Sequence, residues 1–112
     1  MLARKYRANK ADIEQTIKNG YNIQGEFLYA KVSREKKEKT TFAIIISKKI
    51  EKTSVGRHLI KRRVSSAVEE LIKQGKTDFF KTIVFFPKKT DKISDFKTFS
   101  KDVSGVFSKI SK

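Results

Sequence analysis

Residues 47–63 constrain this chain more than any other stretch, because there a strand-like apolar segment passes into the start of a helix-like one amid crowded cations. Seven of the 27 lysines and arginines fall in this run, and Glu51 is its one acidic residue. Like charges this close repel one another, so the crowding gives a fold no stability. Phosphate backbones are polyanions that would neutralise it. The run therefore predicts a folded domain that binds nucleic acid.

Length and charge fit one small basic domain. A chain of 112 residues can build a single modest core. Its 27 basic and 12 acidic side chains give a formal net charge of +15, beyond the magnitude of roughly 2–8 that keeps a small domain soluble. Apolar residues recur in periodic blocks and include nine Phe, which argues against disorder. We predict one domain over residues 1–112, with residues 1–10 as a basic N-terminal arm.

Several protein classes are excluded by what the sequence lacks. The chain has no cysteine, which rules out disulfides, thiol nucleophiles and cysteine zinc sites. Its single histidine, His58, cannot build a histidine-rich metal site. No apolar run reaches the roughly 20 residues of a membrane span, and the first residues lack the apolar stretch of a signal peptide. We expect a cytoplasmic protein with no membrane partner.

The first part of the chain predicts a short helix and then strands. Asn9 is a suitable N-cap for a helix over residues 11–19, which Gly20 would end. Apolar residues alternate along residues 21–33, which is strand spacing.

Two neighbouring segments predict a loop and a buried strand. The charged residues 34–40 predict an exposed hairpin loop between two strands. Residues 41–47 form a continuous β-branched run, which predicts a central strand covered on both faces.

A long helix follows the basic run. Ser54 is its expected N-cap, and the helix should run to about residue 74, with Gly75 at its C-terminal cap. Helical spacing predicts a buried stripe of Ile60, Val64, Ala67, Val68 and Leu71.

The last elements are a strand and a closing helix. Residues 82–86 predict a strand that Pro87 stops, and residues 96–110 predict an amphipathic helix that Ser94 or Asp95 could cap. The order helix, strands, helix, strand, helix predicts an α+β two-layer sandwich.

The start of the long helix carries the candidate binding residues. Cations in its first two turns oppose the helix dipole, so local energetics disfavour them and a ligand explains them better than a solvated face does. Arginine adds a planar fork that grips phosphate oxygens. The candidates are Lys48, Lys49, Lys52, Arg57, His58, Lys61, Arg62 and Arg63.

Catalytic constellations are absent from the pattern. His58 has no Ser or carboxylate partner by spacing, and Glu69 and Glu70 are adjacent, so they diverge by about 100° around a helix. No glycine-rich phosphate loop occurs. The many Phe residues are most simply core, although a ring exposed on a sheet face could stack on unpaired bases.

At these residues the chain resembles the protein subunit of bacterial ribonuclease P. That family has a strand ending in Ser-Lys-Lys, a short loop, and a helix opening with Arg-Asn-Arg and continuing with Lys-Arg. Here the matching residues are 47–49 (Ser-Lys-Lys), 57–59 (Arg-His-Leu) and 61–63 (Lys-Arg-Arg). The early helix ending at Gly20 also fits, and the likeness covers nearly the whole chain. The departures are His58 and Leu59 in the triplet, and isoleucines where the family has Phe in the first helix.

The resemblance implies a division of labour between RNA and protein. An RNA subunit would perform magnesium-dependent removal of the 5′ leader of precursor tRNA, and the protein alone would neither cleave nor hold magnesium. The protein would bind ribonuclease P RNA through residues 48–63, with no obligate protein partner. It would grip precursor tRNA by its leader, in a cleft between the first helix and the sheet. The implied cleft residues are Ile13, Ile17, Tyr29, Ala43, Ile45 and Ser47.

The family also has a left-handed strand–helix–strand crossover, an exception to the right-handed rule. Three other functions stay open on the residues alone. A small ribosomal protein would share the charge and architecture but would need no leader cleft. A DNA-binding module would use residues 54–74 as a recognition helix, which the apolar stripe disfavours. A stand-alone nuclease would need clustered carboxylates.

Overall fold

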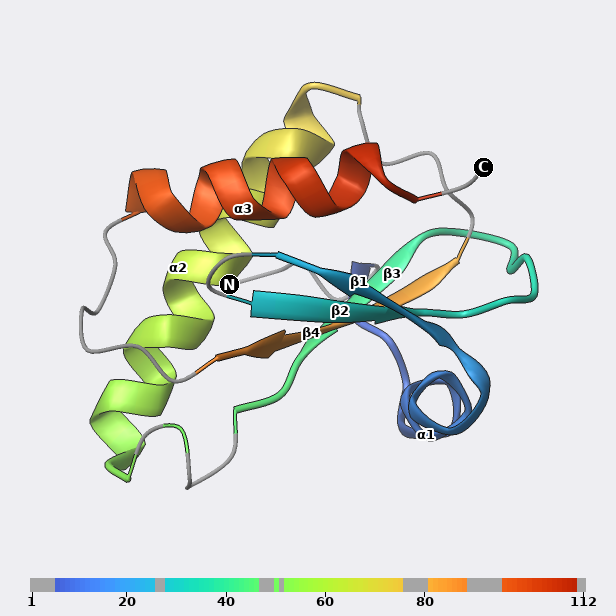
Figure 1. Ribbon diagram of the computed structural model, residues 1–112, viewed down its shortest axis with the longest axis horizontal. Coiled ribbons are helices and arrows are strands. Elements are labelled where there is room, and N and C mark those ends of the chain that lie inside the picture. The colour runs from blue at the N-terminus through green and yellow to red at the C-terminus, as the bar shows by residue number, and fades with distance from the viewer. Residues whose placement is uncertain are drawn as a thin grey trace.

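Three helices and a four-stranded sheet make up the protein, with α2 and α3 on one face of the sheet and α1 on the other (Figure 1). The computed structural model describes residues 6–25, 28–46, 50, 52–75, 81–88 and 96–110, and of residues 96–99 only the backbone. The elements are α1 (Lys10–Asn19), β1 (Tyr21–Gln24), β2 (Leu28–Val32), β3 (Thr41–Ile44), α2 (Ser54–Lys73), β4 (Thr82–Pro87) and α3 (Phe96–Ser108).

The strands lie in the order β1-β2-β4-β3. The β1–β2 and β2–β4 pairs are antiparallel, and β3 and β4 are parallel. Parallel neighbours need a crossover connection, which α2 provides. The α+β class and the element order are therefore as predicted, although helices cover both faces of the sheet and not one face as in a two-layer sandwich.

Two strand predictions were wrong. Residues 34–40 are not a hairpin loop between paired strands, because β4 lies between β2 and β3. Nor is the segment 41–47 a central strand: β3 ends at Ile44 and lies at the edge of the sheet. The interior strands are β2 and β4, and the residues of β4 are buried except for half-buried Phe86. Both predictions failed because the strand that pairs with β3 is distant in the sequence. The Thr41–Thr82 pair joins residues 41 positions apart.

The core lies between the sheet and the α2–α3 layer. Alternate residues of β4, Ile83 and Phe85, face this core, where Phe85 and Phe42 meet Phe107 of α3 with ring centroids 6.0 and 5.8 Å apart. The predicted stripe of α2 is confirmed. Its five residues are buried there: Ile60, Val64, Ala67, Val68 and Leu71.

The ends of the helices follow specific capping contacts. The Asn9 side chain accepts a hydrogen bond from the Asp12 amide at 2.7 Å, which confirms it as the N-cap of α1. The N-cap of α2 is Thr53, one residue before the predicted Ser54, and its hydroxyl accepts from the Gly56 amide at 3.0 Å. Gly75 follows the end of α2 with a φ of +70°, which suits glycine. The proposed caps of the last helix lie outside the described residues.

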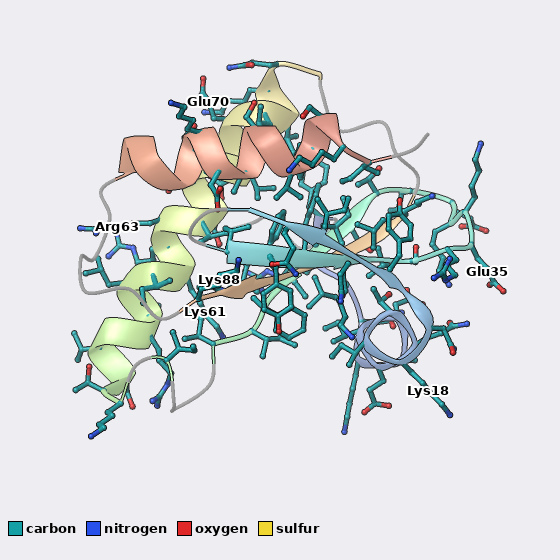
Figure 2. All side chains as sticks on the ribbon, viewed as in Figure 1. Lys18, Glu35, Lys61, Arg63, Glu70 and Lys88 are labelled. Atoms are coloured by element: carbon teal, nitrogen blue, oxygen red, sulfur yellow. The ribbon has the colours of Figure 1, made fainter. Side chains whose placement is uncertain are left out.

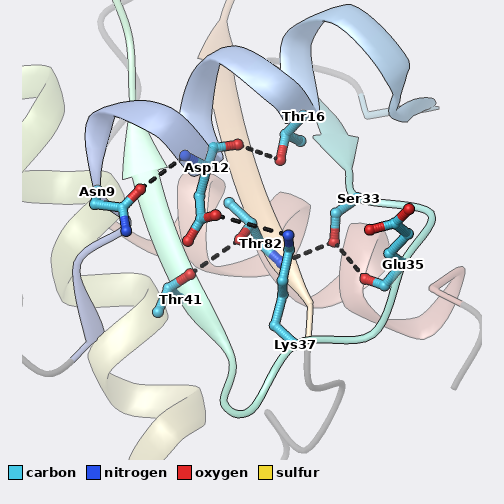
Figure 3. Close-up of polar contacts among 8 residues, drawn as sticks. All are labelled: Asn9, Asp12, Thr16, Ser33, Glu35, Lys37, Thr41 and Thr82. Atoms are coloured by element: carbon cyan, nitrogen blue, oxygen red, sulfur yellow. Dashed lines mark hydrogen bonds and ion pairs between the residues drawn. The ribbon is translucent and has the colours of Figure 1, made fainter.

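Small polar side chains lie between α1 and its face of the sheet (Figure 3). Thr16, Thr41 and Thr82 are buried, and the hydroxyls of Thr41 and Thr82 lie 3.2 Å apart. Gly20 ends α1 where a Cβ would lie 2.4 Å from the Thr16 carbonyl oxygen and 2.7 Å from that of Val32. The backbone of α1 therefore approaches β2 more closely than a side chain at this position would allow.

The cap of α2 gives a stability test. Thr53→Ala removes the acceptor for the Gly56 amide, so we expect the free energy of unfolding to fall by about 1 kcal/mol. Ser54→Ala is the matched control, because Ser54 is the first helical residue and should cost less. Urea unfolding of both variants measures the difference, and a larger loss for Ser54→Ala would contradict the cap assignment.

Candidate nucleic-acid interface

The sheet face on the α1 side changes from polar to apolar along its length. Pairing places Thr41 beside Thr82, Ala43 beside Val84, and Tyr29 beside Phe86 in successive rows on this face. The helix α1 covers the threonine row. The row that holds Tyr29 and Phe86 is only half buried, so apolar surface stays open to solvent there.

Two isoleucines of α1 flank this open surface. Ile13 and Ile17 lie one turn apart, on the side of α1 opposite to Gln15 and Asn19, which face the loop after β2. Ile17 is 37% exposed, unusual for an isoleucine. The Lys31 ammonium donates to the Ile17 carbonyl oxygen at 3.0 Å and links the end of the helix to β2.

The open row contains a pair of aromatic rings. Tyr29 and Phe86 stack with ring centroids 5.0 Å apart and planes at 12°. Phe86 was assigned to the core from the sequence, and that was wrong. Consecutive strand residues point to opposite faces, so the Phe85–Phe86 pair had to divide between the core and this face. That alternation was the signal that could have found it.

We name this open surface the aromatic face. Of the implied cleft residues, strand pairing and alternation place Tyr29, Ala43 and half-buried Ile45 on this face, and Ile13 and Ile17 belong to α1, which lies on the same side of the sheet. Its members are Ile13, Ile17, Tyr29, Ala43, Ile45 and Phe86. Ser47 lies outside the described residues.

The cations of α2 are spread around the helix. An α-helix has 3.6 residues per turn. The side chains of Lys61 and Arg63, two residues apart, therefore point in widely different directions. Figure 2 shows Lys61 on the side of α2 nearer the sheet and Arg63 on the opposite side. His58, Lys61 and Arg62 are exposed, and no acidic residue occupies the first turn. The helix N-terminus therefore adds its own positive dipole end to these charges.

Arg57 is anchored to the chain that precedes it. Its guanidinium donates to the Lys52 carbonyl oxygen at 3.0 Å and to the Ser54 hydroxyl at 3.3 Å. Arg57 therefore helps to fix the loop before α2 as well as adding charge. Lys52 is exposed beside it. The predicted pair Lys48 and Lys49 lies outside the described residues.

An apolar strip interrupts the exposed side of α2. Val55 is 81% exposed and Leu59, one turn later, is 37% exposed. Leu59 stands where the resemblance has the second Arg of the Arg-Asn-Arg triplet. At this position an apolar side chain therefore replaces a cation.

The geometry combines a basic helix, α2, on one side of the sheet with a half-open apolar surface on the other side, within one small α+β domain. The model of the ribonuclease P family matches residues 2–111. The chain therefore belongs to the ribonuclease P protein family, whose role is in tRNA 5′ processing. No curated protein sequence matches it.

Solved structures show the same fold. The ribonuclease P protein of Thermotoga maritima is 19% identical, with a TM-score of 0.80 over 95% of this chain and 98% of that one. The ribonuclease P protein of Staphylococcus aureus is 25% identical, with a TM-score of 0.69 over 96% of this chain and 92% of that one. The fold predicted from the resemblance is thus confirmed.

The exposed cations of α2 can be tested by salt dependence. Arg62→Ala should weaken RNA binding and lower the slope of log affinity against log salt by about 0.7–0.9, the contribution of one phosphate contact. Lys73→Ala, exposed at the far end of the same helix, is the control and should leave the slope unchanged. Equal slopes for wild type and Arg62→Ala would remove this residue from the interface.

Proposed function

We propose that the chain is a ribonuclease P protein subunit that binds the catalytic RNA and the 5′ leader of precursor tRNA, and so supports removal of the leader. The basic half of α2 would contact ribonuclease P RNA, and the aromatic face would hold the single-stranded leader. The protein would work in the cytoplasm as a positioning subunit that performs no chemistry itself. Within the described residues no helix is long and apolar enough to cross a membrane.

The aromatic face carries the proposal. A protein that only packed against folded RNA would need charge, but it would gain nothing from half-exposed Tyr29 and Phe86. Unstacked bases offer π-faces to such rings, and base–aromatic stacking contributes about 1–3 kcal/mol per base with little sequence preference. That tolerance suits leaders of varied sequence.

In the part of the chain that the structure describes, no three His, Asp or Glu side chains lie close enough together to hold a magnesium ion. We propose that RNA phosphates hold magnesium, and that the cations of α2 lower the repulsion between the two RNA molecules. The protein would then reduce the magnesium concentration that accurate cleavage requires.

Cleavage at low magnesium tests the proposal. Ribonuclease P RNA from the same organism is incubated with precursor tRNA in the presence and in the absence of the protein. We expect accurate 5′ maturation at low magnesium only when the protein is present. Equal cleavage with and without it, despite RNA binding, would overturn the proposal and favour a structural role of the ribosomal type.

The aromatic face has a separate test. Phe86→Ala removes one ring of the stack, and we expect the assembled enzyme to bind precursor tRNA about tenfold more weakly, within the range for one stacked base. Affinity for mature tRNA, which has no leader, should not change. Because Phe86 is half buried, urea unfolding must show that the variant is folded at the assay temperature. An equal loss for both RNAs would contradict a leader site here.

A further inference from the structure

The β1–β2 pair ends at Gly25 and Leu28 with only one of its two backbone hydrogen bonds. Gln24 pairs with Tyr29, so Gly25 and Leu28 are the next residues in register. Residues that face each other in such an antiparallel pair normally exchange two N–H···O bonds. Here the Gly25 amide donates to the Leu28 carbonyl oxygen at 2.8 Å, whereas the Leu28 amide donates to a side chain. The second bond of the pair is therefore replaced by contacts from outside the two strands.

The acceptor for the Leu28 amide is Asp102 of α3. Its Oδ2 accepts this part-buried hydrogen bond at 3.0 Å, and a bond to a charged acceptor is stronger than one between neutral groups. Both carboxylate oxygens lie 2.7 Å from the place that a Cβ on Gly25 would take. The carboxylate therefore fits against a residue without a side chain, and it ties α3 to the first residue of β2.

Two lysines hold the same end of the pair. The Lys88 ammonium donates to the Gly25 carbonyl oxygen at 2.9 Å. Lys88 follows β4, at the end of the sheet where β2 begins (Figure 2). The Lys109 ammonium, just after α3, donates to the Gln24 carbonyl oxygen at 3.2 Å. Side chains from two other parts of the fold therefore fix this end of the β1–β2 pair.

These contacts lie directly beside the stacked rings of the aromatic face. Leu28 is fully buried in the core and immediately precedes Tyr29, whose ring stacks on Phe86. Successive strand residues point to opposite faces, so a rotation of the backbone at Leu28 would also turn the Tyr29 ring. Lys88 stands two residues after Phe86. Both rings are thus within two residues of a contact that fixes the end of the pair.

We propose that Asp102 is a positioning residue for the leader site. It lies on α3, across the sheet from the aromatic face, and acts by fixing the Leu28 amide. Through that amide it sets the orientation of Tyr29 against Phe86. This role rests on the proposed function, because the leader is the ligand that the aromatic face would hold. Affinity for the leader then depends on a carboxylate on the opposite side of the sheet.

Two variants of equal charge isolate this role. Asp102→Ala removes the acceptor of the Leu28 amide, and Asp102→Asn keeps an oxygen that can accept. Both remove one negative charge, which by itself favours RNA binding, so weaker binding cannot come from the charge. In the assembled enzyme, we expect Asp102→Ala to bind precursor tRNA about fivefold more weakly than Asp102→Asn, as for the loss of one hydrogen bond. The two variants should bind mature tRNA equally.

A double-mutant cycle separates positioning from a general loss of structure. If Asp102 acts through the Tyr29 ring, the difference between Asp102→Ala and Asp102→Asn should disappear in a Tyr29→Ala background. A difference that persists there, or one that is equally large for mature tRNA, would overturn the positioning role. Equal affinities of the two variants for precursor tRNA in the wild-type background would overturn it as well.

The free protein gives a second readout. Ring-proton chemical shifts of Tyr29 report the neighbouring Phe86 ring, and we expect them to change in Asp102→Ala but not in Asp102→Asn. Urea unfolding shows whether each variant is folded at the assay temperature. If Asp102→Ala is not, Asp102→Glu takes its place, because it keeps the wild-type charge while its extra methylene displaces the acceptor. Unchanged Tyr29 shifts in a folded Asp102→Ala or Asp102→Glu variant would contradict the positioning role.

The Phe86→Ala test keeps this role distinct from the proposed function. If Phe86→Ala weakens binding of precursor tRNA and the Asp102 variants do not differ, the positioning role alone fails. If Phe86→Ala and Tyr29→Ala both leave that binding unchanged, the leader site fails and the positioning role fails with it. The cleavage assay at low magnesium is independent of Asp102.

Discussion

Hydrogen bonding of β4 to β2 on one side and to β3 on the other places every other element of the molecule. The parallel β3–β4 pair obliges the chain to cross over, and α2 is the crossover. The antiparallel β2–β4 pair brings Tyr29 beside Phe86 on one face and Ala30 beside Phe85 on the other. The interior pair of β2 and β4 therefore contributes to both the core and the aromatic face.

The two faces of this sheet differ in how they are covered. On the core side, α2 and α3 bury large apolar residues, which supplies most of the driving force for folding. On the other side, α1 packs through small threonines and Gly20 and covers only one end of the sheet. Apolar surface left half open this way carries no benefit for stability, and in a soluble domain such patches mark binding sites. The exposed cations of α2 are the reason we propose a polyanion as the ligand.

Periodicity in the sequence predicted the elements well, since it depends on local spacing. The buried stripe of α2 and the cap at Asn9 are examples. Long-range pairing was harder: nothing local in residues 41–47 reveals that β4 enters the sheet between β2 and β3. An apolar β-branched strand looks central whether it is buried by neighbours on both sides or lies at an edge beside an arm and a helix.

The residues of the candidate site show the same difference between features that are local in the sequence and features that depend on the fold. Charge density located the basic half of α2 without any structure, because charge shows directly in the sequence. Phe86 was missed because adjacent phenylalanines suggest a core until strand alternation assigns them to opposite faces.

The central claim is that the leader lies on the aromatic face, and directed cleavage from a tethered probe tests it most directly. The chain has no cysteine, so Gln24→Cys creates a unique attachment point for an iron–EDTA probe on exposed β1, in register with Tyr29. Ser104→Cys on exposed α3 places the same probe on the opposite layer. In the assembled enzyme, we expect the probe on residue 24 to cut the leader within a few nucleotides and the probe on residue 104 to leave it intact. Equal leader cutting from both positions, or none from residue 24, would contradict the account.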